Sequence, residues 1–261
     1  MQTSPLHGVL YLIRGLKLIL LPGVRRYVVM PLLINIAVFG LLIAAGAAWF
    51  NSFVTSLLPS LPGWLDWLVW PLWVLFILAA LLVLFFTFSL LANLIASPFN
   101  GLLAEAIERR LRGEEVPTEG SLWQLLRETP AILLSQLWKM GYAALRALPL
   151  LILFVIPGLN LIAPLLWFVF GAWMLALEYL DYPMGNHGLL FPEQRRRAGE
   201  RRLLVLGFGA AISGLTMIPV INFLVMPVAV AGATALWVEC LSSPTGDSPQ
   251  RGAAKKKGRS P

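Results

Sequence analysis

The chain has 261 residues and a formal net charge of +7; 58% of its residues are hydrophobic and only 13% are charged. Soluble domains have roughly 45–50% apolar and about 25% charged residues. Four stretches without a charged residue, at 27–50, 67–104, 147–177 and 203–238, each exceed the roughly 20 residues that cross a bilayer. This composition excludes a soluble fold and predicts an all-α integral membrane protein.

The first predicted element is an amphipathic helix within residues 1–26. Between Leu6 and Leu21 the apolar residues recur at spacings of three and four, and Arg14 and Lys17 share another face. No small-residue cleavage site follows, so we expect the segment to be retained rather than removed as a targeting peptide. We expect this helix to lie in the membrane surface; the alternative is a short helix packed on the body of the protein.

Two full membrane spans are predicted at 27–50 and 67–97. Their orientation follows from where the 20 lysines and arginines lie: 14–26, 109–146, 195–202 and 251–259. The loop at 51–64 has none. Because positive charge accumulates on the cytoplasmic side of membrane proteins, we expect this loop outside and both chain termini in the cytoplasm.

The second span carries a polar face. Ser89, Asn93, Ser97 and Asn100 are four, four and three residues apart, which confines them to an arc of about 80° on a helix. They either form hydrogen bonds between helices or line a polar path through the membrane.

A new amphipathic helix is expected after that span, as the first of the cytoplasmic helices over 98–146. Ser97 fits the N-cap and Pro98 fits the first helical position. Glu105 and Arg109 are four residues apart and can pair on the surface of this helix.

The third uncharged run contains IPGLNLIAP at 156–164. If the run crossed the membrane once, the five arginines of 195–202 would lie outside, whereas a turn at IPGLN keeps them inside. Measured from Arg146 and from Glu178, the two arms span about 16 and 21 Å, less than the roughly 30 Å hydrocarbon layer. We therefore predict a half-penetrating helical hairpin at 147–178, with a kinked single span as the alternative.

The sequence IPVINFLVMP at 218–227 repeats the pattern of isoleucine, proline, asparagine and a second proline. This repeat predicts a second half-penetrating hairpin at 203–239, since internal repeats are common in transport proteins. Asn160 and Asn222 are expected to bond the backbone groups that are freed at the two tips.

The tail at 243–261 is polar and basic and is predicted to be disordered, which leaves 1–242 as a single membrane domain. Cys240 is the only cysteine, so no intramolecular disulfide can form and a packing role is expected. The predicted fold is an all-α membrane protein with two full transmembrane helices, two half-penetrating helical hairpins, and interfacial and cytoplasmic amphipathic helices.

A candidate anion site lies in LPGVRRY at 21–27. Pro22 and Gly23 break the surface helix, and Arg25 and Arg26 follow where the first span begins. A helix N-terminus offers unpaired amides and about half a positive charge, and two guanidinium groups add two full charges. The combination suits a tetrahedral dianion; the alternative is that these arginines contact lipid phosphates.

Asp181, His187 and Glu193 lie close together in sequence, as the members of a metal or catalytic site sometimes do. His7 is the only other histidine and no two metal ligands have helical spacing, so no metal site is predicted. His187 has no evident nucleophile as a partner, and the chain lacks a phosphate-binding loop of the GxxxxGK[ST] type, so neither an enzyme nor ATP hydrolysis is predicted. Asp181 and His187 are expected to cap helices in the connection between the hairpins.

Three segments carry a family resemblance: ASPFNGLLAE at 96–105, LDYPMGNHGLLFPEQR at 180–195 and LPGVRRY at 21–27. Over about residues 1–242 the chain resembles the CysZ family of bacterial sulfate permeases. The resemblance implies uptake of sulfate, with sulfite as a second candidate, across the bacterial inner membrane for cysteine biosynthesis. It implies a homo-oligomer in the lipid bilayer, and neither a cofactor nor a nucleic-acid partner is expected.

The resemblance also assigns roles to residues. Sulfate recognition falls on four residues of the LPGVRRY segment: Gly23, Val24, Arg25 and Arg26. The polar pore-side motif of the family falls on Asn100, Gly101 and Glu105. The candidate polar path then consists of Ser89, Asn93, Ser97, Asn100, Gly101, Glu105 and Arg109.

Two function classes are open at this point. A permease or channel would gather a dianion at the two arginines and pass it along the polar face between the hairpins. A non-transporting membrane scaffold or assembly protein would use the same polar residues only to tie helices together. Family members look like oligomers whose protomers insert in opposite directions, but the charge bias of this chain predicts a single orientation.

Overall fold

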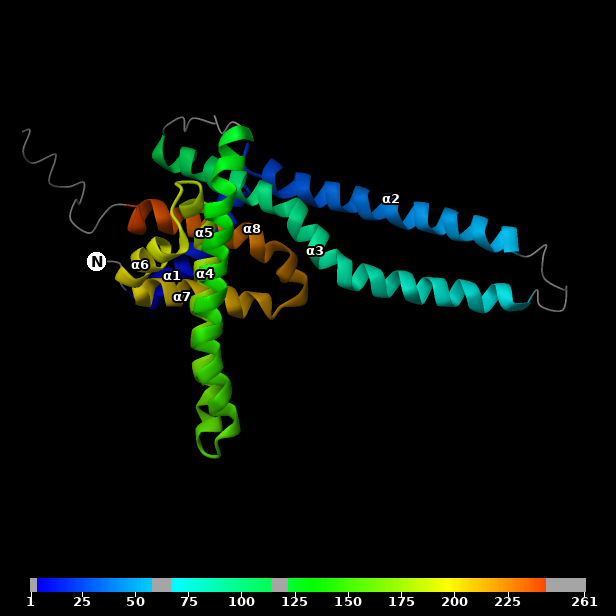
Figure 1. The fold of residues 1–261 in the computed structure, drawn as a ribbon. Coiled ribbons are helices and arrows are strands. Elements are labelled where there is room, and N and C mark those ends of the chain that lie inside the picture. The colour runs from blue at the N-terminus through cyan, green and yellow to red at the C-terminus, as the bar shows by residue number, and fades with distance from the viewer. Residues whose placement is uncertain (1–3, 58–66, 114–121, 243–261) are drawn as a thin grey trace, which may run out of the picture. The chain divides into compact units, whose positions relative to one another are not determined.

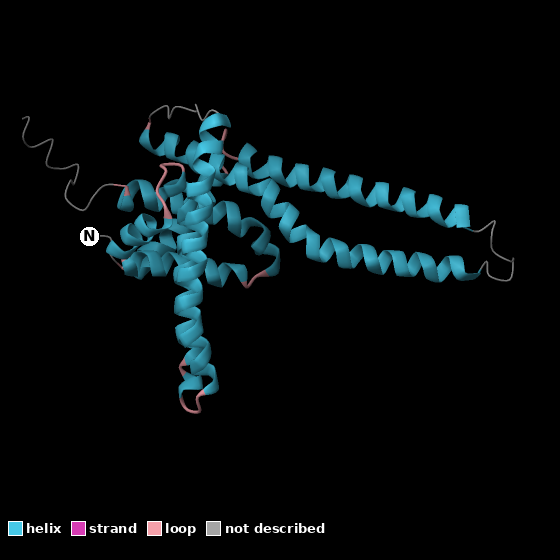
Figure 2. Cartoon of the chain, viewed as in Figure 1, coloured by secondary structure: helices cyan, strands magenta, loops and turns pink. Residues whose placement is uncertain are grey.

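The computed structural model describes residues 4–57, 67–113 and 122–242. Over these ranges the chain forms helices joined by turns and contains no strand (Figure 1, Figure 2), as predicted. The elements in chain order are α1 (Pro5–Ile19), α2 (Arg26–Leu57), α3 (Val69–Arg112), α4 (Leu122–Val155), the 3-10 helix η3 (Leu159–Leu161), α5 (Ala163–Gly185), α6 (Phe191–Glu200), α7 (Arg202–Thr216), α8 (Pro219–Leu236) and the π-helical turn η4 (Trp237–Leu241).

The helices form two compact units. One, which we call the helical body, comprises Met1–Arg25 and Asn100–Pro261, and the other comprises Arg26–Phe99. In the second unit the ring of Phe50 from α2 stacks on Phe76 of α3, with ring centroids 4.2 Å apart. The candidate residues of the sequence are therefore distributed over both units.

Helix length and composition identify the membrane segments. Four segments of the described chain are long and apolar enough to cross a membrane: Arg26–Ser56, Leu134–Val155, Ala163–Gly185 and Leu224–Leu241. The chain is therefore an all-α, multi-pass membrane protein. By contrast, α7 has 15 residues, about 22 Å of helix, which is shorter than a hydrocarbon layer of roughly 30 Å.

The chain turns at IPGLN. The amides of Leu159 and Asn160 donate to the carbonyl of Ile156 at 3.2 and 3.1 Å, and Gly158 has a φ of 86°, which glycine adopts without a steric cost. Beyond the turn α5 runs back along α4, as Figure 1 shows. The structure thus has a hairpin at this position and not the kinked single span.

The helical arms of this hairpin extend beyond the uncharged run. α4 continues unbroken from Leu122 to Val155 and includes Arg146. The arm length estimated from Arg146 therefore does not mark the end of a helix. How deeply the hairpin enters a membrane depends on the level at which Arg146 lies, and half-penetration stays a prediction.

The second hairpin turns at a different point of the repeat. The amides of Met217 and Ile218 donate to Gly214 and Leu215 carbonyls at 3.3 and 3.2 Å, and Asn222 already lies in the first turn of α8. The expectation that Asn222 occupies the tip is thus wrong. Pro219 suits the first position of a helix, and valine at 220 stands where the first copy has a glycine with positive φ, which valine disfavours.

The expected helix start at Ser97 is also wrong. α3 runs as one helix from Val69 to Arg112, through Pro98. The apolar run continues on both sides of Pro98, and a membrane helix tolerates the loss of one backbone hydrogen bond at proline. A local N-cap signal was therefore overridden by the surrounding helix.

α1 packs on the helical body, in contact with α7 and α8. A Cβ placed on Gly8 would meet backbone atoms of Leu204 and Phe208, so the two backbones are close because glycine lacks a side chain. Other apolar side chains of α1 point outward, such as Leu6 and Leu10 with 74% and 56% of their surface exposed. One face of α1 thus packs against other helices, as in the alternative of a short helix packed on the body of the protein. Its other face is apolar and exposed, which suits contact with lipid.

The close approach of α5 and α7 predicts the effect of one methyl group. A Cβ on Gly209 would collide with the carbonyl oxygen of Ala172 and lie 3.1 Å from the Cβ of Ala176. We expect Gly209→Ala to lower the free energy of unfolding by about 1–3 kcal/mol through overpacking, measured as a lower unfolding temperature of the detergent-solubilised protein. Gly214→Ala on the same helix is the control, because no atom lies within 4 Å of that position. Equal drops for both variants would contradict this account of the packing.

Candidate functional site

The predicted anion site lies in the turn between α1 and α2. The amides of Val24 and Arg25 donate to the carbonyl of Leu21 at 3.1 and 3.3 Å, and the Val24 side chain is buried with 3% of its surface exposed. Gly23 has a φ of 86°. The turn therefore needs glycine for its backbone conformation and is anchored by Val24, whose predicted sulfate-binding amide is engaged with Leu21 in this structure.

Both arginines of this turn are exposed. Nη2 of Arg26 donates to the Tyr27 hydroxyl at 2.8 Å, and its guanidinium lies 4.8 Å from the centroid of the same ring. Among the residues that the structure describes, neither Arg25 nor Arg26 forms an ion pair with a carboxylate. Neither guanidinium group is thus neutralised by a carboxylate within the described chain.

The predicted polar path lies on α3. The side chains of Ser89, Asn93 and Ser97 lie outside the described residues, so their placement stays a prediction. Nδ2 of Asn100 donates to the Tyr182 hydroxyl at 3.4 Å, and Asn100 is buried.

The next turns of α3 complete the described part of this path. The carbonyl of Gly101 accepts a hydrogen bond from Asn186 at 2.9 Å. Arg109 and Glu105 pair at 2.9 Å, as expected from their spacing. The buried Nε of Arg109 has no hydrogen-bond partner within the described chain, which leaves one donor that a passing anion could use.

Two segments far apart in the chain, around Glu108 and around His187, meet in the helical body. Nε2 of His187 lies 2.9 Å from both carboxylate oxygens of Glu108, which is buried and also pairs with Nε of Arg112 at 2.8 Å. The His187 ring packs against Trp237 with centroids 5.5 Å apart. His187 therefore joins the connection after α5 to α3. No group of three or more His, Cys, Asp or Glu side chains in the described ranges is arranged to hold a metal ion.

A buried lysine that sequence reasoning missed connects α4 to α5. Nζ of Lys139 lies 2.7 Å from Glu178 and 2.9 Å from Asp181. Asp181 also accepts hydrogen bonds from Gln136 at 3.1 Å and Gln194 at 2.6 Å. The available signal was a lone lysine on an apolar helix, which requires a counter-charge in its surroundings.

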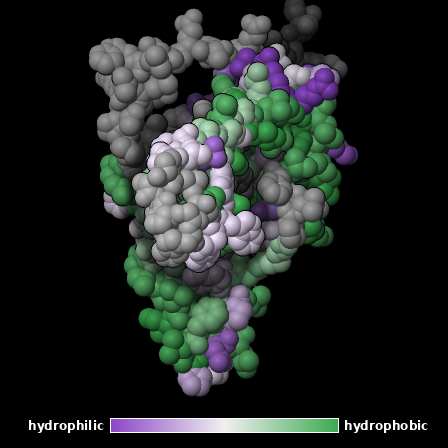
Figure 3. Space-filling view, turned by 90° about the vertical axis from the view of Figure 1, so that its right-hand side faces the viewer, coloured by the Kyte–Doolittle hydropathy of each residue, from purple (hydrophilic) through white to green (hydrophobic). Residues whose placement is uncertain are grey.

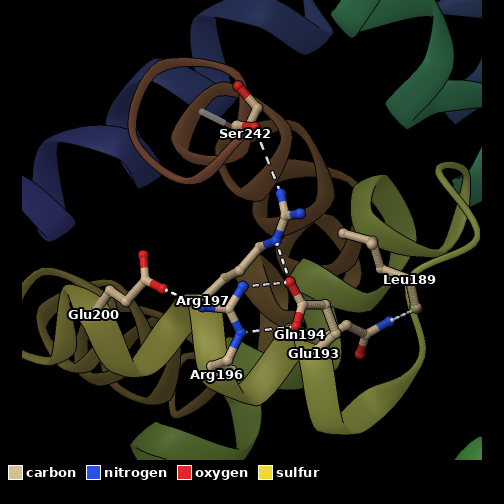
Figure 4. Close-up of polar contacts among 7 residues, drawn as sticks. All are labelled: Leu189, Glu193, Gln194, Arg196, Arg197, Glu200 and Ser242. Carbon is tan, nitrogen blue, oxygen red and sulfur yellow. Dashed lines mark hydrogen bonds and ion pairs between the residues drawn. The ribbon is translucent and has the colours of Figure 1, made fainter. Parts of the chain in front are cut away.

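α6 carries its own ion pairs (Figure 4). Glu193 accepts hydrogen bonds from Arg196 at 2.6 and 2.8 Å and from Arg197 at 2.9 Å. These bonds lower the pKa of Glu193 to about 2. Arg196 also pairs with Glu200 at 2.8 Å, and Arg197 reaches the carbonyl of Ser242. Glu193 thus serves as an ion-pair partner on a polar helix.

Comparison with known proteins identifies the family. The family described as "Sulfate transporter CysZ/Etoposide-induced protein 2.4" matches residues 11–227. A protein of Salmonella typhimurium named "Sulfate transporter CysZ" is 46% identical over 244 residues, which cover 91% of this chain and 94% of the relative. A protein of Salmonella typhi with the same name is 45% identical over the same shares of both chains. The chain therefore belongs to the family of sulfate transporter CysZ and etoposide-induced protein 2.4, as the three sequence motifs had indicated.

Proposed function

We propose that this protein takes up inorganic sulfate across the bacterial inner membrane, for cysteine biosynthesis and without ATP hydrolysis. The observation that carries the proposal is its 46% identity, over 91% of its length, to a relative named as a sulfate transporter. The protein is then a transporter and not an enzyme, and sulfite is a second candidate substrate. Nothing in the described contacts favours the alternative of a non-transporting scaffold.

Sulfate is first bound at Arg25 and Arg26 in this proposal. Sulfate is a tetrahedral dianion, and the planar guanidinium group presents parallel N–H donors that match two of its oxygens. Both side chains are exposed, so they are accessible before transport begins. Because the Val24 amide already donates to Leu21, the two guanidinium groups provide most of the binding, with the backbone of Gly23 and Val24 shaping the turn.

The polar face of α3 then carries the anion through the membrane. Removing water from a dianion is costly, so the path must offer hydrogen-bond donors along its length. Asn100 and Arg109 supply amide and guanidinium donors on one helix, about two and a half turns apart. Glu105, which pairs with Arg109 at 2.9 Å, offsets part of the positive charge and so prevents the anion from binding too tightly to leave. Ser89, Asn93, Ser97 and the backbone at Gly101 complete the proposed path.

The proposed topology has α2 and α3 crossing fully and the two hairpins entering from the cytoplasmic side. From Arg146 to Val155, where α4 ends, is about 14 Å of helix, and α7 spans about 22 Å. With Arg146 at the membrane surface, both lengths are less than a hydrocarbon layer of roughly 30 Å, which supports half-penetrating hairpins. Both termini then lie in the cytoplasm, α1 lies at the interface with its exposed apolar face toward lipid, and the protein assembles as a homo-oligomer.

Uptake of radiolabelled sulfate into proteoliposomes tests the transport and its entry site. We expect wild-type protein to carry sulfate. Arg25→Ala combined with Arg26→Ala should raise the sulfate concentration that gives half-maximal uptake by about 100-fold or more, since each charge-assisted hydrogen bond to the anion contributes about 1.5–3 kcal/mol.

Arg110→Ala is the matched control for this experiment, because Arg110 is an exposed arginine of α3 outside the proposed site. Its uptake should equal that of the wild type. Unchanged uptake by the double variant would rule out the entry site, whereas no uptake by the wild type would rule out transport itself and favour the scaffold.

Cysteine labelling tests the depth of the hairpins. In a Cys240→Ser background, Asn160→Cys and Asn222→Cys should not react with a membrane-impermeant thiol reagent added from outside. In the proposed topology Asn160 lies in the tip of the first hairpin and Asn222 just after the tip of the second, and both tips end within the membrane. Ser52→Cys, at the predicted outer end of α2, should react. If Asn160→Cys reacts as readily as Ser52→Cys, the first hairpin crosses the membrane completely.

A further inference from the structure

The ring of Tyr142 holds two arginines from different helices. Arg146, one turn further along α4, lies with its guanidinium carbon 5.4 Å from the ring centroid. Arg195 of α6 lies 5.0 Å from the same centroid, and the ring also packs on Phe191 at 5.5 Å. The start of α6 and the middle of α4 are thus held together around one tyrosine.

The charges of these two arginines are not compensated within the described chain. Neither Arg146 nor Arg195 forms an ion pair there, whereas their neighbour Arg196 pairs with Glu193 and Glu200. Lys139, one turn before Tyr142, is likewise paired. The two guanidinium carbons lie 5.4 and 5.0 Å from one ring centroid, so an anion bound beside this ring would be attracted by two positive charges.

The surroundings show what kind of anion fits. α6 is a polar helix with three consecutive arginines, Arg195 to Arg197, and such a helix is expected at the membrane surface. This would place Arg146, which shares the Tyr142 ring with Arg195, at the same level. On the membrane side of Arg146, α4 exposes apolar side chains, including Leu148 at 60% and Ile152 at 59%. The lower part of Figure 3, which this hairpin occupies, is mainly hydrophobic. A headgroup at the arginines would therefore have its acyl chains beside an apolar helix.

We propose that Arg146, Arg195 and Tyr142 form a binding site for the phosphate group of an anionic phospholipid, whose acyl chains lie along the exposed apolar face of α4. Free sulfate or phosphate offers the same tetrahedral anion, but it makes no use of that apolar face. The site is separate from the transport proposal and stands without it.

A bound headgroup would also fix the depth of the first hairpin. Phosphate at Arg146 holds that residue in the headgroup layer, and about 14 Å of α4 then extends into the bilayer up to Val155. Without an anion, a deeper position would bury an unpaired arginine in hydrocarbon, which is costly. The bound lipid therefore limits how deeply the first hairpin enters the bilayer.

Native mass spectrometry of the full-length protein, titrated with phosphatidylglycerol or with phosphatidylethanolamine of the same chain length, tests the proposal. We expect Arg146→Ala combined with Arg195→Ala to weaken phosphatidylglycerol binding about tenfold or more, since each surface arginine contributes roughly fivefold toward an anionic lipid. Binding of phosphatidylethanolamine should not change. Arg196→Ala, which removes the same charge from α6 but is already paired, should leave phosphatidylglycerol binding as in the wild type.

Two outcomes would overturn the site. Equal phosphatidylglycerol binding by the double variant and the wild type would exclude it, and displacement of the lipid by millimolar sulfate would show that the site takes a free anion instead. Gel filtration and circular dichroism establish that the variant is folded. If the double variant does not fold, Arg195→Gln, which alters one exposed side chain, is compared with Arg196→Gln by the same titration.

Discussion

The helical body depends on one constraint: a charge within a membrane protein must be neutralised by a partner or held at the water surface. Lys139, buried on α4, contacts Glu178 and Asp181 of α5. Because Asp181 also accepts a hydrogen bond from Gln194 of α6, the neutralisation of one lysine fixes the base of the first hairpin and the start of α6 together. Glu108 does the same for α3 and the connection after α5. The two family motifs themselves meet through hydrogen bonds, from Asn100 to Tyr182 and from Asn186 to the carbonyl of Gly101.

Close helix packing accounts for the rest of the body. In lipid the hydrophobic effect does not drive helices together, so small residues that let backbones approach become the main source of association. Gly8 and Gly15 of α1 face backbone atoms of α7 and α8. The two repeated hairpins differ as a result: in the second arm, 67% of the apolar stretch within Leu224–Leu241 is buried, against 33% within Ala163–Gly185 of the first hairpin. The other arm of the first hairpin, Leu134–Val155, is only 6% buried. The second hairpin forms the core of the body, whereas the first exposes its apolar surface, so the sequence repeat does not make two equivalent structures.

Local chemistry was predictable from the sequence and long-range contacts were not. Proline and glycine in IPGLN specify a turn whatever lies around it, and the turn is present. The same reasoning failed at Asn222. The second copy resembles the first, but valine at 220 replaces the glycine whose positive φ makes the turn, so the second turn forms elsewhere. At Pro98 a correct local preference gave way to a long apolar helix. The partners of Lys139 lie about 40 residues further along the chain, and no spacing rule connects positions so far apart. Arg25 and Arg26 were predicted as the anion site because both charge and family motif pointed to them, and this assignment stays a prediction.

The positive-inside rule counts every arginine equally. In the described chain, however, some arginines have a carboxylate partner and others have none. Arg196 has a carboxylate on its own helix, and an anion could bind it only by displacing that partner, at the cost of the existing pair. Arg25, Arg26, Arg146 and Arg195 have no carboxylate partner in the described chain, so binding an anion breaks no ion pair there. What each pair binds then depends on its neighbours, since sulfate and a lipid phosphate are both tetrahedral anions. The first pair adjoins a helix N-terminus and its free amides, which suit a small ion that must leave again, whereas the second adjoins an apolar helix face, which retains an acyl chain.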